Sequence, residues 1–116
     1  MALGGAIGSV SRYVLSTIVF RAWGSLLPAG TFIVNLIGCM AFGAIVGAAE
    51  QRVVLTPEAR AFLLAGVLGG FTTFSTYAFE SVALMQGGQF VVAGLNVVGQ
   101  VLAGLLGLWV AYAIAR

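Results

Sequence analysis

Four long apolar stretches, separated by short polar connections, make up nearly the whole chain. A helix needs about 20 mostly apolar residues to cross a bilayer. The stretches predict four helices, at about residues 3–20, 28–48, 57–85 and 89–115. The connections are residues 21–27, 50–56 and 86–88. The second connection leads into Thr56-Pro57-Glu58, which is typical of a capped helix start. The pattern predicts an all-α integral membrane protein.

The third stretch contains an unusual polar segment, Gly69-Gly70-Phe71-Thr72-Thr73-Phe74-Ser75-Thr76-Tyr77. Adjacent glycines lower helix propensity, and Thr and Ser side chains can bond the backbone in place of the helical ladder. We therefore expect the third helix to break between residues 69 and 75. Irregular backbone at membrane depth survives only where protein buries it or where it lines a water-filled cavity. The break predicts an ion or solute site, and the alternative is a kinked helix that only packs.

Polar residues also recur at helical spacing in two other stretches. The stripe in the second helix consists of Thr31, Asn35, Gly38 and Phe42. The stripe in the fourth helix consists of Asn96, Gln100 and Gly104. An amide inside a membrane can line an aqueous path, or it can join two helices by a hydrogen bond worth about 1 kcal/mol. For Asn35 both interpretations remain open.

The composition supports a single transmembrane domain, residues 1–116, because 61% of the residues are hydrophobic and only 7% are charged. Soluble domains carry roughly 25% charged residues. Two charges fall inside the predicted helices. Arg12 either extends to the membrane surface or acts as a vestibule charge that attracts anions. Glu80 requires a partner or water, and we favour structural pairing over proton transfer.

Several classes of function find no support in the residues. The net charge of +2 is too small for a nucleic-acid surface. The chain has no histidine, one cysteine and no carboxylate pair at a useful spacing, so neither catalysis nor a His/Cys metal site is expected. What remains is a conduit lined by neutral hydroxyl and amide donors, which favour an anion. Phe74 and Tyr77 lie three residues apart and could add positively polarised ring edges, although they could equally be packing aromatics.

Three segments together carry a family resemblance. They are the segment 69–77, the segment Gly30-Thr31-Phe32-Ile33-Val34-Asn35-Leu36-Ile37-Gly38, and the segment Gly4-Gly5-Ala6-Ile7-Gly8-Ser9-Val10-Ser11-Arg12-Tyr13. With these motifs the chain resembles the Fluc (CrcB) family of microbial fluoride channels. The resemblance implies passive fluoride export across the cell membrane by an antiparallel dual-topology dimer with two pores.

The resemblance also implies a role for each matching residue. Asn35 would be the pore amide, with Thr31 beside it. Phe74 and Tyr77 stand where the family has two fluoride-coordinating phenylalanines. The hydroxyl track would include Ser75 and Thr76. The backbone carbonyls of Gly69 and Thr72 would bind a structural Na⁺ on the dimer axis, and Glu80 matches the acid of the motif.

The chain departs from the family pattern at three of its predicted pore positions. Tyr77 replaces a phenylalanine, and its added hydroxyl could occupy the place of the ion. Asn96 stands where a tyrosine is common, and Gln100 stands where a serine is common. Both residues can still form hydrogen bonds, so the track is altered rather than lost. We expect a homodimer, and a heterodimer with a homologous chain is the alternative.

Two rival functions are considered. A four-helix multidrug exporter needs a membrane carboxylate in its first helix, where this chain has Arg12 and no acid. A non-transporting assembly subunit would use its polar residues only to hold helices together. The orientation signal is weak, because Arg52, Arg60 and Arg116 lie on the N-terminal side and Arg21 lies opposite. Such a small bias is compatible with insertion in both directions.

Overall fold

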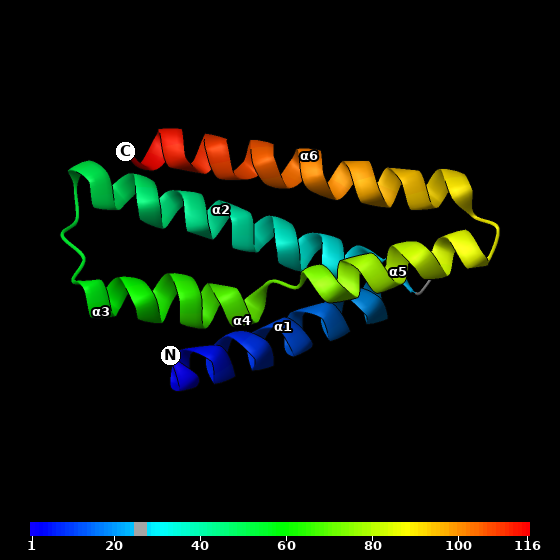
Figure 1. The fold of residues 1–116 in the computed structure, drawn as a ribbon, viewed down its shortest axis with the longest axis horizontal. Coiled ribbons are helices and arrows are strands. Elements are labelled where there is room, and N and C mark those ends of the chain that lie inside the picture. The colour runs from blue at the N-terminus through cyan, green and yellow to red at the C-terminus, as the bar shows by residue number, and fades with distance from the viewer. Residues whose placement is uncertain (25–27) are drawn as a thin grey trace.

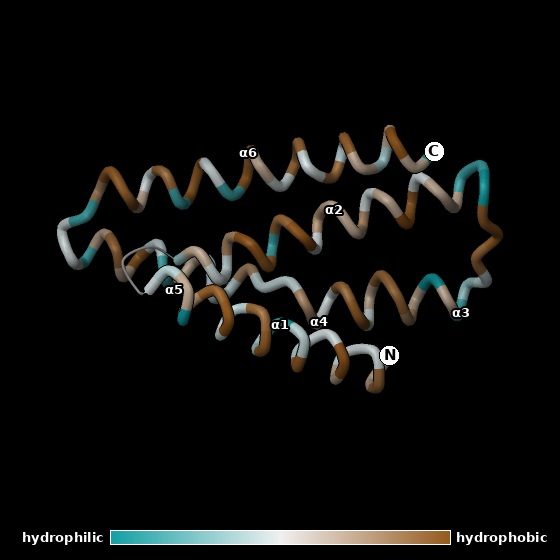
Figure 2. Tube along the Cα trace, turned by 180° about the vertical axis from the view of Figure 1, so that it is seen from behind, coloured by the Kyte–Doolittle hydropathy of each residue, from teal (hydrophilic) through white to brown (hydrophobic). Residues whose placement is uncertain are grey.

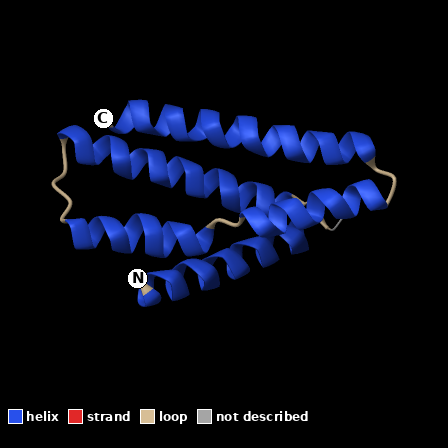
Figure 3. Ribbon diagram, viewed as in Figure 1, coloured by secondary structure: helices blue, strands red, loops and turns tan. Residues whose placement is uncertain are grey.

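The computed structural model describes residues 1–24 and 28–116, and in these residues it contains helices and no strand (Figures 1 and 3). The elements are α1 (Ala2–Trp23), α2 (Ala29–Gln51), α3 (Pro57–Arg60), η1 (Ala61–Leu68), α4 (Gly69–Phe71), α5 (Phe74–Gln86) and α6 (Phe90–Ala115). Four helical segments, Ala2–Trp23, Ala29–Gln51, Pro57–Gln86 and Phe90–Ala115, are long and apolar enough to cross a membrane. The predicted fold class, four membrane-spanning helices with a broken third, is therefore confirmed. Of the predicted connection 21–27, residues 21–23 belong to α1, and residues 25–27 lie outside the described part.

The helices divide into a long pair and a more irregular group. α2 and α6 lie side by side along their length, while α1 packs against η1, α4 and α2 (Figure 1). Both chain termini lie at the same end of the molecule, together with the end of α2 and the start of α3 (Figure 1). Figure 2 shows hydrophobic residues along all four spans, with hydrophilic positions in the connections and at isolated places inside the helices.

Glycines bring α2 and α6 into backbone contact. A Cβ atom added at Gly43 would lie 2.1 Å from the carbonyl oxygen of Leu108, and one added at Gly47 would lie 2.4 Å from that of Tyr112. Small residues allow such close approach between helices in lipid. The pair is thus a closely packed frame against which the third span is placed.

The third span begins with the predicted helix cap and then continues as a wider type of helix. The Thr56 hydroxyl accepts a hydrogen bond of 3.1 Å from the backbone N–H of Ala59, so the expected cap is confirmed. Further along, the backbone N–H of Gly69 reaches the carbonyl of Leu64, five residues earlier, which is the pattern of a π-helix. No sequence pattern predicted this wider segment.

The helix breaks at Thr72 and Thr73, inside the predicted interval. Thr72 has φ −81° and ψ 158°, and Thr73 has φ −149° and ψ 115°, so both are extended. The expectation that the adjacent glycines help to break the helix is wrong, because Gly69 has φ −62° and ψ −37° and belongs to α4. Gly70 instead permits contact with α1, since a Cβ atom there would lie 2.7 Å from the carbonyl oxygen of Gly5.

Candidate functional site

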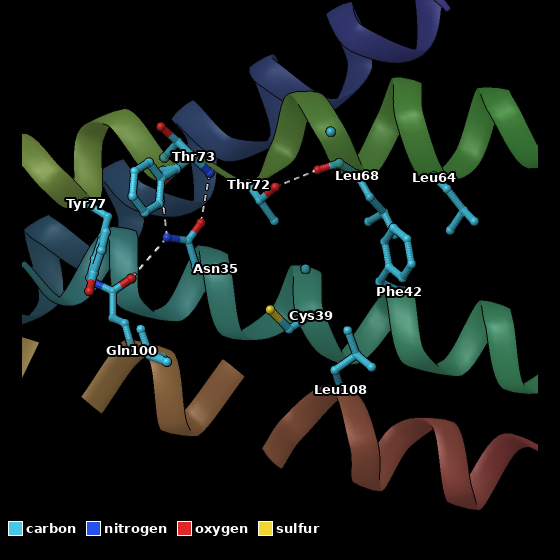
Figure 4. A pocket seen from close by; sticks show the side chains of 14 residues that line it. Asn35, Cys39, Phe42, Leu64, Leu68, Thr72, Thr73, Tyr77, Gln100 and Leu108 are labelled. Atoms are coloured by element: carbon cyan, nitrogen blue, oxygen red, sulfur yellow. Dashed lines mark hydrogen bonds between the residues drawn. The ribbon is translucent and has the colours of Figure 1, made fainter. Parts of the chain in front are cut away.

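The break is held to α2 by the side chain of Asn35. The backbone N–H of Thr73 donates to Asn35 Oδ1 at 2.9 Å, and Asn35 Nδ2 donates to the carbonyl oxygen of Thr73 at 3.1 Å (Figure 4). One side-chain amide therefore pairs with both polar groups of Thr73. Buried backbone groups need such partners, most of all in a membrane. The Thr73 hydroxyl in turn accepts from the backbone N–H of Thr76 at 3.3 Å and caps α5.

A chain of side-chain hydrogen bonds continues from Asn35 into α6 and back to α5. Asn35 Nδ2 donates to Gln100 Oε1 at 3.0 Å, and Gln100 Nε2 donates to Asn96 Oδ1 at 2.8 Å. Asn96 Nδ2 donates to Ser81 Oγ at 2.9 Å, and Ser81 Oγ donates to the carbonyl oxygen of Tyr77 at 2.8 Å. Asn96, Gln100 and Ser81 are all buried. We call these five residues the amide network.

Two aromatic rings lie beside this network on α5. The ring centroids of Phe74 and Tyr77 are 5.6 Å apart and the ring planes are inclined at 45°. Phe74 is 78% exposed, whereas Tyr77 is 9% exposed. The Tyr77 hydroxyl donates to the carbonyl oxygen of Val97 at 2.7 Å. The hydroxyl that the sequence adds at this position is therefore bound to the backbone of α6.

The first cavity, of about 400 Å³, adjoins the break and contains part of the predicted site (Figure 4). Its lining includes six predicted residues: Asn35, Gly69, Thr72, Phe74, Tyr77 and Gln100. Cys39 also lines it and is half-buried. The cavity thus brings together the amide, the aromatic pair and the end of α4.

The second cavity, of about 550 Å³, contains a different group of predicted residues. Thr31, Thr76 and Glu80 line it, and Ser16 and Gln89 add further polar groups. The Thr31 hydroxyl donates to Glu80 Oε1 at 2.9 Å. Glu80 Oε2 is buried and has no hydrogen-bond partner among the described residues.

Three predicted residues are not among the described residues that line these two cavities. Ser75 is exposed, with its hydroxyl 3.4 Å from that of Thr73. Asn96 is buried inside the amide network and lines a third, mostly apolar cavity of about 320 Å³. Arg12 is half-buried on α1, next to Tyr13, which does line the second cavity. The predicted pore residues are therefore distributed rather than gathered in one place.

The end of α4 lies beside the first cavity. The last four carbonyls of a helix lack intrahelical partners. Gly69 and Thr72 both line the first cavity, and Thr72 directs its N–H and its hydroxyl to the carbonyl of Leu68, at 3.0 Å each. Hard cations prefer oxygen ligands. Within residues 1–24 and 28–116 no group of three or more His, Cys, Asp or Glu side chains could hold a metal ion. Backbone oxygens at this helix end fit a cation without any such side-chain cluster.

Sequence reasoning left two important groups out of the predicted site. The peptide group of Thr73 pairs with Asn35, and Ser81 links Asn96 to the carbonyl of Tyr77. Ser81 follows Tyr77 by four residues, so helical spacing on α5 could have indicated it. The pairing of Thr73 with Asn35 joins two different spans, and no local pattern signals it.

The fold and the two cavities define a multi-pass α-helical membrane protein with a discontinuous third span and polar side chains beside the break. The comparison with known families then identifies the family to which the chain belongs. Residues 1–112 match the family described as "CrcB-like protein, Camphor Resistance (CrcB)". The chain belongs to the CrcB family.

Curated relatives match all or most of the chain. A protein named "Fluoride-specific ion channel FluC" from Nitratidesulfovibrio vulgaris (strain Miyazaki F) is 47% identical over 116 residues, which is 100% of this chain and 94% of the relative. Its namesake from Maridesulfovibrio salexigens is 47% identical over 104 residues, 90% of this chain and 82% of the relative. The namesake from Nitrosococcus oceani is 40% identical over 116 residues, covering 100% and 93%.

Proposed function

We propose that this protein is a fluoride-specific ion channel of the cell membrane that lets fluoride leave the cell passively. The observation that carries the proposal is the first cavity, where the Asn35 and Gln100 amides, the Phe74 and Tyr77 rings and the broken helix meet. The full-length relatives named fluoride-specific channels support the same substrate. The function is transport and involves no catalytic step.

The chemistry of the cavity suits a small, strongly hydrated anion. Neutral hydroxyl and amide donors can replace water around an ion without trapping it in the way that a ring of arginines would. The edge of an aromatic ring carries the positive part of its quadrupole, so Phe74 can present its edge to an anion. Because dehydration is favourable only if many short contacts form at once, a lining fitted to fluoride should reject the larger chloride ion.

The second cavity supplies the other part of the proposed path. Thr31 and Thr76 line it and can offer hydroxyl hydrogens, with Ser75 one residue before Thr76 on the same helix. Arg12 lies next to a residue of its lining and would raise the local concentration of anions. The Thr31 hydroxyl binds Glu80 in the single chain, so it would have to turn toward a passing ion.

We further propose that the working unit is an antiparallel, dual-topology homodimer. Phe74 is 78% exposed in the single chain, although it borders the first cavity, and a second copy would cover it. Arginine bias is compatible with both orientations: Arg52 follows α2, Arg60 ends α3 and Arg116 follows α6, whereas Arg21 lies in the last turn of α1. A heterodimer with a homologous chain is the alternative.

A structural Na⁺ fits this arrangement. The carbonyls of Gly69 and Thr72 would hold it, together with the same groups of a second copy, because α4 ends there and leaves carbonyls without helical partners. The ion would join the two broken helices and take no part in conduction. The multidrug exporter finds no specific support, since α1 contains no carboxylate.

Flux from purified protein tests the proposal. Liposomes loaded with potassium fluoride or potassium chloride would carry the single chain at low density, with empty liposomes as the control. We expect fast fluoride release and no chloride release above the control. Equal release of the two ions would refute a fluoride-specific channel, and exchange of protons for a lipophilic cation would indicate an exporter. A chain that releases no fluoride alone, but releases it when mixed with a homologous chain, would indicate a heterodimer.

A further inference from the structure

We propose that Gln100 competes with the permeating anion for the Asn35 side-chain donor and so sets the apparent affinity of this channel for fluoride. The inference rests on the proposed function, which it deepens at one residue. Gln100 Oε1 lies 3.0 Å from Asn35 Nδ2, and both side chains line the first cavity. The acceptor thus occupies a position that an anion bound to the Asn35 amide would need.

The direction of every hydrogen bond in the amide network follows from its two backbone ends. The N–H of Thr73 can only donate and its carbonyl can only accept, so Asn35 must present Oδ1 to the former and Nδ2 to the latter. Gln100 must then turn its oxygen toward Asn35 Nδ2, which leaves its nitrogen for Asn96 Oδ1. At the other end Ser81 donates to the carbonyl of Tyr77 and accepts from Asn96. No amide in the network can be reversed without placing two like groups in contact.

The Asn35 amide is the donor for which the anion and Gln100 compete. A side-chain amide has two N–H hydrogens. Asn35 uses one on the carbonyl of Thr73 and one on Gln100 Oε1, so within the described chain both are engaged. The bond to Thr73 secures the helix break and is part of the fold. The bond to Gln100 joins two side chains, and a rotation of the Gln100 side chain can release it.

An anion would therefore reach Asn35 by exchange. Its approach replaces the N–H···O contact of Gln100 with an N–H···anion contact, and no covalent bond changes. Removing the competing oxygen leaves water as the partner of that N–H. The net difference between a protein acceptor and water is about fivefold in an equilibrium constant, which corresponds to about 1 kcal/mol.

Two substitutions at the same position separate this competition from a loss of packing. Gln100→Met keeps the length of the side chain but removes the acceptor that faces Asn35. Gln100→Glu keeps an acceptor oxygen for Asn35 in either protonation state. Both variants lose the amide N–H that binds Asn96, and only a protonated glutamic acid can replace it, with its O–H. Gln86→Met, at the exposed end of α5, is the control for the substitution itself.

The measurement is the fluoride concentration that gives half-maximal flux in liposomes. We expect Gln100→Met to lower it about fivefold and Gln100→Glu to leave it unchanged or raise it. Gln86→Met should match the wild type in half-saturation and in maximal rate. An unchanged or higher value in Gln100→Met, or an equal fall in both Gln100 variants, overturns the inference. Wild-type protein that passes no fluoride overturns the proposed function instead, and this inference with it.

A second measurement uses the wild-type protein and applies even if Gln100→Met does not fold. The side-chain N–H₂ signals of Asn35 and Gln100 would be followed by NMR in ¹⁵N-labelled protein in detergent. Added fluoride should shift both pairs of signals with one common half-saturation, and added chloride should not. Asn35 signals that stay in place at saturating fluoride would overturn the competition.

Discussion

The two ends of the α2–α6 pair are held together by different chemistry. Toward the end of α2, Gly43 lies against the carbonyl of Leu108, with no room for a side chain between the helices. Toward its start, Asn35 and Gln100 meet through a hydrogen bond of 3.0 Å. At one end glycines of α2 contact the backbone of α6, and at the other end the two helices are joined by a network of buried amides.

The difference indicates that the two ends of the α2–α6 pair have different roles. In lipid, helices gain nothing from hiding apolar surface from one another, so close van der Waals contact and polar bonds must hold them together. The glycine end supplies a frame whose geometry is fixed by backbone atoms. The amide end accommodates the broken third span, because Asn35 pairs with the peptide group of Thr73. Changes at the first end should act on stability, and changes at the second should act on conduction as well.

The largest expected effect is the loss of the frame in Gly43→Ala. The new Cβ atom would lie 2.1 Å from the carbonyl oxygen of Leu108, so one of the two helices must move. We expect a destabilisation of about 3 kcal/mol or more, the upper range for overpacking. Gly94→Ala on α6 is the control, because a Cβ atom there meets nothing within 4 Å. The yield of monodisperse protein and its melting temperature measure the effect, and equal values for the two variants would contradict it.

At the amide end, Asn35→Asp should greatly reduce conduction and weaken the fold. Asn35 donates two hydrogen bonds, to Thr73 and to Gln100, whereas a carboxyl group has one hydrogen at most. At least one acceptor therefore faces another acceptor, and an ionised Asp also places a negative charge beside the anion path. We expect fluoride flux to fall at least about tenfold, the equivalent of about 1.4 kcal/mol. Gln86→Glu adds an acid at the exposed end of α5 and should retain wild-type flux.

Phe74→Ile tests whether conduction can be lost without any loss of the fold. Phe74 packs little within its own chain, where it is 78% exposed, and isoleucine keeps the bulk that a second copy would cover but has no positively polarised edge. We expect no measurable fluoride flux and a change in stability within about 0.5 kcal/mol. Phe90→Ile, at a 68% exposed position on α6, should conduct normally. Normal flux from well-folded Phe74→Ile would mean that the ring only packs.

Sequence patterns predicted the parts of this molecule that depend on local properties. Span length follows from apolar content, and the break follows from the hydroxyl residues at Thr72 and Thr73, which are the two extended positions. The same reasoning was wrong about Gly69, because a glycine can remain helical when its role is elsewhere. Helix propensity describes which backbone conformations a residue allows, and tertiary contacts decide which of them it adopts.

Sequence patterns named most of the polar residues that line the two cavities, but they did not predict how these residues are arranged. Helical spacing placed Asn35 and Gln100 on inward stripes, yet nothing in one helix specifies which partner on another helix receives each hydrogen. The separation of Thr31 from Asn35, in two different cavities, depends on where α5 begins after the break. The dimer, the structural Na⁺ and the pore roles of these residues stay predictions.

The smallest expected effect belongs to the hydroxyl of Tyr77. Tyr77→Phe removes its hydrogen bond of 2.7 Å to the carbonyl of Val97, inside the amide end of the pair. Tyr112→Phe is the matched change at the glycine end, where the hydroxyl donates to Glu50 Oε2 at 2.5 Å. Each variant loses one hydrogen bond, so each should be destabilised by only about 0.5–1 kcal/mol.

The two tyrosine variants should be equally stable, so flux is the property that separates their roles. Tyr77 is 9% exposed and its ring is 5.6 Å from the Phe74 ring, so the phenylalanine keeps the ring pair and loses only the hydroxyl that binds Val97. We expect Tyr77→Phe to conduct fluoride at least as well as the wild type, and Tyr112→Phe to conduct at the wild-type rate. Liposome flux and thermal unfolding of both variants provide the measurement. If Tyr77→Phe instead lost most of its flux at unchanged stability, the hydroxyl would belong to the conduction path, and its bond to Val97 would have to open during transport.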